Sequence, residues 1–155
     1  MKALLLILFL GVSSTLSPAQ VLNTFLGNWE GSGTLMGKEG SFEMKWEQVL
    51  NDEFLKLNFK NGFSDGSFSM EATAFYKLTA DSTFSGFWFD SRGVSFPLNG
   101  SYTFNSITTE WENPGVEKGR TEYKFLESGE IRVFDFVFRN GTYQKFATAT
   151  YQQKE

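Results

Sequence analysis

The sequence contains no histidine and no cysteine. Histidine is the usual general base near neutral pH, the commonest metal ligand and a common axial ligand of haem iron. Cysteine supplies thiolate nucleophiles, structural zinc sites and disulfide bonds. Their absence excludes histidine and thiol chemistry, so we expect no metal, no cofactor and a role other than enzymatic catalysis. Any remaining chemistry would depend on carboxylates, Lys, Tyr, Ser and Thr.

Basic residues are also in short supply. The 155 residues include 14 Lys and Arg against 18 Asp and Glu, which gives a net charge of −4. A mildly acidic chain without a basic run is a poor binder of nucleic acid or of anionic membranes. No apolar run reaches the about 20 residues that a membrane-spanning helix needs. We therefore expect neither a nucleic-acid partner nor a membrane span.

Residues 1–19 have the layout of a secretory signal peptide. Lys2 is followed by an apolar stretch at 3–12 and then by a small-x-small site that ends at Ala19. The stretch is too short to cross a bilayer as a helix. We expect cleavage after Ala19, which leaves residues 20–155 as one exported domain, periplasmic or secreted.

Residues 20–155 have the pattern of short strands separated by turns. Apolar and polar residues alternate in 42–47, and the same period of two recurs along the chain. Turn dipeptides such as Asn61-Gly62, Asn99-Gly100 and Asn140-Gly141 separate these runs. About ten evenly spaced strands predict an all-β fold, a single antiparallel up-and-down β-barrel, since closure removes exposed edges. Helical periodicity is limited to one short turn at 21–25.

Residues 25–33 read Phe-Leu-Gly-Asn-Trp-Glu-Gly-Ser-Gly. The Gly-x-Trp pair resembles the first strand of lipocalins and fatty-acid-binding proteins, where the Trp closes one barrel end from inside. The longer Gly-x-Trp-x-Gly-x-Gly pattern resembles nitrobindin-type haem barrels and a family of bacterial lipocalin-like (calycin-like) proteins without assigned function. The segment Trp-Phe-Asp-Ser-Arg-Gly at 88–93 resembles a mid-chain motif of the latter. This resemblance covers almost all of 20–155 and implies a lipocalin-like barrel closed by Gly27 and Trp29.

The ligands of these relatives are not implied. Nitrobindin-type barrels hold haem iron through a histidine, which this sequence lacks, so haem is not expected. Fatty-acid-binding proteins hold a carboxylate with an Arg-x-Tyr pair. Here Arg120 and Tyr123 are three residues apart, which puts their side chains on opposite faces of a strand.

If Trp29 points inward, the barrel encloses a candidate cavity for a small apolar ligand. Its candidate lining residues are Trp46, Trp88, Tyr102, Trp111, Tyr123 and Arg132. The alternative is that the aromatic residues only fill the core. The strand at 131–139 leaves two orientations open, because both of its faces are largely apolar. If the phenylalanine face points inward, Arg132 lies inside near the rim and could anchor an anion. If the aliphatic face points inward, Asp135 is buried. Charged residues are rarely buried, so we expect Arg132 at the rim and Asp135 in solvent.

Glu110 and Glu112 share a strand face at a separation of roughly 7 Å, which is in the range of an inverting glycosidase pair. A small barrel rarely offers a sugar cleft, so we expect a solvated face there. The sequence therefore predicts an exported carrier or sensor that binds an apolar or amphipathic molecule. The alternative is a protein-interaction or inhibitor module with a filled barrel, whose partner protein the sequence does not identify.

Overall fold

The computed structural model describes residues 22–155; the expected signal peptide and its cleavage site lie outside these residues. A short 3-10 helical turn, η1 (Asn23–Phe25), precedes ten strands. The strands are β1 (Gly27–Leu35), β2 (Lys38–Val49), β3 (Phe54–Phe63), β4 (Ser69–Leu78), β5 (Thr83–Asp90), β6 (Ser95–Thr103), β7 (Ser106–Asn113), β8 (Glu117–Phe125), β9 (Ile131–Arg139) and β10 (Thr142–Gln153). None of the helical structure in 22–155 is long and apolar enough to cross a bilayer.

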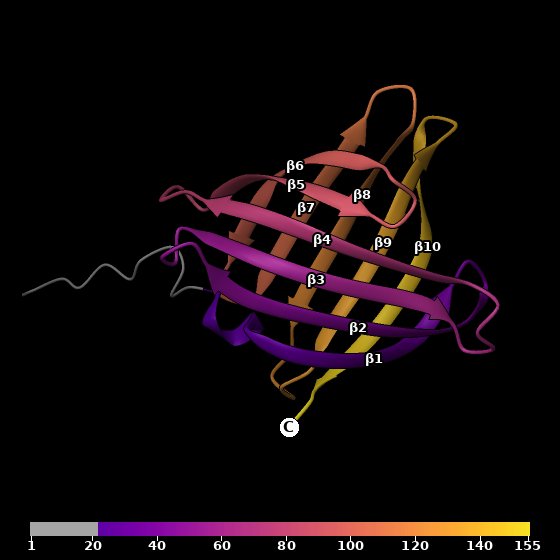
Figure 1. Cartoon of the computed structure of the whole chain (residues 1–155), viewed down its shortest axis with the longest axis horizontal. Coiled ribbons are helices and arrows are strands. Elements are labelled where there is room, and N and C mark those ends of the chain that lie inside the picture. Colours follow the sequence, from indigo (N-terminus) through magenta and orange to yellow (C-terminus); the bar gives the residue numbers. More distant parts are fainter. Residues whose placement is uncertain (1–21) are drawn as a thin grey trace, which may run out of the picture.

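The strands form a closed antiparallel barrel. Each strand pairs with the next in sequence, and β1 pairs with β10 to complete the ring. In Figure 1, β1–β4 run across one side and β7–β10 cross them steeply on the other. The predicted all-β, up-and-down fold is confirmed.

The up-and-down order fixes which turns share an end of the barrel. The β1–β2, β3–β4, β5–β6, β7–β8 and β9–β10 turns lie together at what we call the open end. The other four turns and η1 lie at the opposite, closed end.

The closed end is filled by aromatic side chains. Trp29 is 2% exposed, and its Nε1 donates a hydrogen bond to the backbone oxygen of Phe25 at 2.8 Å. Phe25 and Trp29 each meet Phe125 edge to ring, with ring centroids 6.2 and 6.3 Å apart. The indole therefore ties η1 across the barrel end, as the resemblance implied for the Gly-x-Trp pair.

The glycines that follow Trp29 permit close contact between β1 and β10. A Cβ at Gly33 would lie 1.9 Å from the backbone oxygen of Thr148, and one at Gly31 would lie 2.7 Å from the ring of Tyr151. A side chain at either position would push β10 away and open the ring. The Gly-x-Gly pattern is thus a requirement of barrel closure.

Two of the predicted turns are wrong. Asn61-Gly62 lies inside β3 and Asn99-Gly100 lies inside β6. In both cases the strand is paired on both sides, which overrides the local turn preference. Gly100 instead provides a close approach, since a Cβ there would lie 2.0 Å from the backbone oxygen of Thr108.

Candidate functional site

The interior of the barrel contains a cavity of about 390 Å³ that reaches the open end. Met36, Arg92 and Arg139 lie at its mouth and are exposed, so the cavity communicates with solvent there. The volume is within the range of small-molecule sites in proteins. The lining combines aromatic and polar side chains. The aromatic residues are Phe59, Phe68, Trp88, Phe96, Trp111 and Phe146, and the polar ones are Asn61, Tyr76, Thr109, Thr121, Tyr123 and Asp135.

The aromatic walls are held in place by their neighbours. Trp111 meets Phe96 edge to face with ring centroids 5.4 Å apart, and Trp88 meets Phe59 at 5.5 Å. A Cβ at Gly119 would lie 2.1 Å from the Trp111 ring, so glycine on β8 lets this indole lie against the barrel wall. The apolar surfaces are therefore formed before any ligand arrives.

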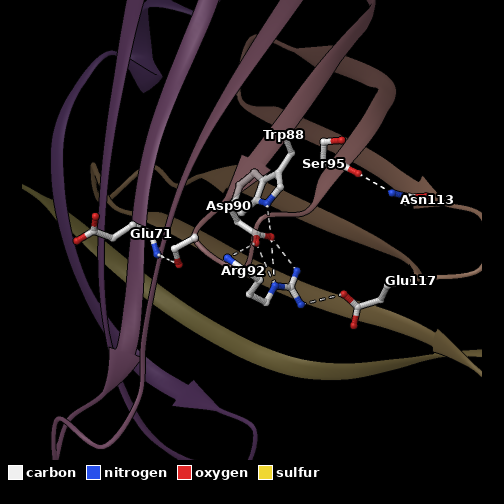
Figure 2. Close-up of polar contacts among 8 residues, drawn as sticks. Glu71, Trp88, Asp90, Arg92, Ser95, Asn113 and Glu117 are labelled. Atoms are coloured by element: carbon white, nitrogen blue, oxygen red, sulfur yellow. Dashed lines mark hydrogen bonds and ion pairs between the residues drawn. The ribbon is translucent and has the colours of Figure 1, made fainter.

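The segment 88–93 fixes one wall and the β5–β6 turn. Figure 2 shows Asp90 between the Trp88 indole and the Arg92 guanidinium. Its Oδ2 accepts hydrogen bonds from Trp88 Nε1 at 3.1 Å and from Arg92 Nη2 at 2.8 Å, and its Oδ1 accepts one from the Arg92 backbone N–H at 2.9 Å. Burial raises the pKa of Asp90, but the hydrogen bonds from Arg92 and Trp88 outweigh it and hold the pKa below its ordinary value. This motif orients side chains at the mouth of the cavity.

A chain of hydrogen bonds runs along one wall of the cavity, across the neighbouring strands β7, β8 and β9. Trp111 Nε1 donates to Thr121 Oγ1 at 3.3 Å, and Thr121 Oγ1 donates to Asp135 Oδ1 at 2.7 Å. Burial raises the pKa of Asp135 to about 6, against a lowering by the Thr121 hydrogen bond. The Asp135 side chain lies deep in the barrel but still borders the cavity.

The inward position of Asp135 corrects the expectation that it faces solvent. The aliphatic face of β9, with Ile131, Val133 and Val137, is buried in the barrel, and Asp135 shares that face. The phenylalanine face points outward, where lysine ammonium groups cover it; Lys145 lies 5.4 Å from the ring centre of Phe134. Lys118 lies in the same way 5.5 Å from the ring centre of Phe138, so two of the three outer phenylalanines are partly covered.

Two buried polar atoms in the cavity have no partner. Asn61 Oδ1 and Thr109 Oγ1 make no hydrogen bond with any described residue, 22–155, although the two residues are only 5% and 2% exposed. Such an atom costs about 1–3 kcal/mol, so native structures contain few of them. Both residues line the cavity, where a bound molecule can supply the missing partner.

The structure brings together only some of the predicted lining residues. Trp88, Trp111 and Tyr123 border the cavity. Trp46 is buried in the closed-end core, where its ring lies 5.3 Å from that of Tyr76, and does not border the cavity. The Tyr102 hydroxyl donates to the Thr79 backbone oxygen at 2.6 Å, also at the closed end.

Arg132 is exposed on the outer face of β9, so the prediction that it lines the cavity is wrong. The cause is the inward aliphatic face of that strand. Sequence reasoning did not select Asn61 or Thr109 as site residues. The available signal was a polar residue that continues an inward-facing apolar series, as Asn61 does after Leu57 and Phe59.

Glu110 and Glu112 lie on the outer face, where each is engaged by a neighbouring strand. Arg120 pairs with Glu110, whose Oε2 also accepts a hydrogen bond from the Tyr143 hydroxyl at 2.7 Å. Glu112 pairs with Lys118 at 3.1 Å. The expectation of a solvated polar face is confirmed, and the pair has a structural role.

Comparison with known proteins supports the fold. No family model and no curated protein matches the chain. Among solved structures, the barrel is similar to the crystal structure of Rv2717c from M. tuberculosis, with 17% identity and a TM-score of 0.68 over 91% of this chain and 100% of that chain. The redesigned β-barrel b11L5F_LGL is 15% identical, with a TM-score of 0.45 over 89% of this chain and 96% of that chain. The redesigned β-barrel mFAP1 bound to DFHBI is 16% identical, with a TM-score of 0.43 over 88% of this chain and 98% of that chain. At 17% identity, the likeness to Rv2717c shows the fold alone.

Proposed function

We propose that this protein is an exported binding protein, a carrier or sensor, that holds a small apolar or amphipathic molecule inside its barrel. The observation that carries the proposal is the cavity itself, with aromatic walls and two unpartnered polar atoms on Asn61 and Thr109. A barrel that served only as a scaffold gains stability by filling such a space with side chains. The open cavity thus argues against the alternative of an interaction module with a filled barrel.

The size of the cavity limits the ligand. A volume of about 390 Å³ lies near the lower end of the roughly 300–1,000 Å³ found for ligand pockets. One or two aromatic rings with a short polar substituent fit this space.

Export and the lipocalin-like relationship are parts of the same proposal. They are supported by the signal-peptide layout of residues 1–19 and by the Gly-x-Trp-x-Gly-x-Gly pattern that begins at Gly27. Native mass spectrometry of the protein purified from its own host tests export and ligand binding together. We expect a chain that begins at Gln20 and an added small-molecule mass that is lost on denaturation.

A titration with naphthalene, a neutral aromatic probe, tests the cavity directly. Trp88 and Trp111 border the cavity, so their fluorescence should change as the probe binds. Val137 also borders the cavity, and Val137→Trp should fill it and abolish binding. The control is Phe138→Trp, which adds an indole to the exposed face of the same strand and should bind normally. Equal binding by the two variants, or none by the native protein, would contradict the proposal.

A further inference from the structure

Two of the polar groups that face the cavity have free capacity to accept hydrogen bonds. Asn61 Oδ1 is an unpartnered acceptor, and the Asp135 carboxylate accepts from Thr121 through one oxygen only. Thr121 is committed as a donor to Asp135 and as an acceptor from Trp111. No residue in 22–155 donates a hydrogen bond to the second oxygen of Asp135, and a ligand that donates would complete this arrangement.

Asp135 also has no counter-ion. The ion pairs within residues 22–155 involve other carboxylates. The groups near Asp135 on other strands are hydroxyl-bearing: Thr121 and Tyr123 on β8, Tyr76 on β4 and Tyr151 on β10. Asp135 is partly buried, and a carboxylate that is partly withdrawn from water without a cation is costly when ionised.

The remaining charges of the cavity lie at its mouth. Arg92 is held there by Asp90 and by Glu117, at 2.8 and 3.4 Å. Arg139 is exposed at the end of β9, four residues along the strand from Asp135. Four residues of strand span roughly 13 Å, so this arginine does not neutralise the buried carboxylate.

The aromatic walls favour the same kind of ligand. Trp, Tyr and Phe faces attract cations through the ring quadrupole, most strongly where water is excluded. The indoles of Trp88 and Trp111 border the cavity together with Phe96. We infer that the bound molecule is an organic amine, whose protonated nitrogen pairs with Asp135 and whose apolar body lies between these aromatic side chains. This inference rests on the proposed binding function and adds the chemical class of the ligand.

Three probes of matched shape separate the inference from the proposed function: 2-phenylethylamine (cation), n-propylbenzene (neutral) and 3-phenylpropanoate (anion). At pH 7.5 the amine should bind at least about tenfold more tightly than n-propylbenzene, because a charge-assisted hydrogen bond replaces an apolar contact. The anion should bind most weakly. Isothermal titration calorimetry measures all three on the full mature protein.

Asp135→Asn removes the charge and keeps an acceptor for Thr121. The variant should bind the amine and n-propylbenzene within about threefold of each other. The control is Glu112→Gln, which removes a carboxylate from the outer face of β7 and should keep the preference for the amine. If Asp135→Asn retains the full preference, the inference is wrong.

The native protein gives a second test that needs no variant. Between pH 7.5 and 5 the amine affinity should fall about tenfold, because Asp135, with a pKa of about 6, becomes protonated. The affinity for n-propylbenzene should not change. If n-propylbenzene binds as tightly as the amine at pH 7.5, the cavity is a binding site without amine selectivity, and only the inference fails. If none of the three probes binds, both the inference and the proposed function fail.

Discussion

Replacement of Asp135 by Asn should make the unliganded protein more stable at neutral pH. Burial raises the pKa of this carboxyl from 3.8 to about 6, so the folded state holds its proton more tightly than the unfolded state does. Between about pH 4 and 6 the folded protein therefore binds more protons, and its stability falls as the pH rises through that window. Asn has nearly the same shape, cannot ionise and still accepts the hydrogen bond from Thr121.

The magnitude follows from the pKa shift. About two pKa units at about 1.4 kcal/mol each give an upper value of about 3 kcal/mol for the cost of ionising Asp135 in the barrel. Water in the cavity reaches the side chain and reduces this cost. We therefore expect Asp135→Asn to raise the free energy of unfolding at pH 7 by about 1–3 kcal/mol, and to change it little at pH 4.

Urea denaturation followed by tryptophan fluorescence at pH 4, 5, 6 and 7 measures this difference. The matched control is Asp65→Asn, in the exposed β3–β4 turn. Hydrogen bonds from Ser67 lower the pKa of Asp65, so its contribution to stability is present above the unfolded pKa and is lost as the pH falls. At neutral pH, Asp135→Asn should therefore raise the free energy of unfolding, whereas Asp65→Asn should lower it. A difference between native protein and Asp135→Asn that does not change with pH would refute the assignment of the buried carboxyl to this residue.

Three further substitutions test the barrel and its cavity. Trp29→Ala should lower the free energy of unfolding by about 3–5 kcal/mol, since it empties the closed end; a loss under about 1 kcal/mol in urea would show that the indole does not seal the barrel. In Gly119→Ala, the new Cβ would lie only 2.1 Å from the Trp111 ring and should push that ring into the cavity. Naphthalene binding should then weaken about tenfold or more, and an unchanged titration would contradict this. Asp90→Asn should lower the free energy of unfolding at pH 7 by about 1–3 kcal/mol, because the ion pair with Arg92 and its hydrogen bonds are weakened. Its effect should vanish as the pH falls below the lowered pKa of Asp90, and an unchanged urea midpoint at pH 7 would contradict the role of that carboxylate.

The strands were predictable because most of them bury one face only. In β2 the residues Phe42, Met44 and Trp46 are buried while their neighbours are exposed, so the period of two is visible in the sequence. The Asn140-Gly141 turn was also predictable, since both residues have positive φ, at 52° and 79°.

The orientation of β9 was not predictable from its own residues. Both of its faces are largely apolar, and each includes charge, with Arg132 on one and Asp135 on the other. The outcome depends on neighbouring strands, which supply the lysines that cover the outer phenylalanines. The position of Asp135 in the cavity follows from that orientation, so it could not be predicted from the sequence of β9.

The two ends of the barrel divide stability from binding. At the closed end, Phe25 and Trp29 lie in a packed aromatic core with satisfied polar groups. In the cavity that reaches the open end, Asn61, Thr109 and Asp135 each carry a cost to folding, as unpartnered atoms or as a partly buried carboxyl without a cation among residues 22–155. All three border one cavity, where a single ligand can relieve them together. Since a molecule that binds only the folded state stabilises it by mass action, these costs are offset when the cavity is occupied. The free protein should consequently be limited in stability by its open end, and an amine bound there should raise its unfolding temperature most at a pH where Asp135 is ionised.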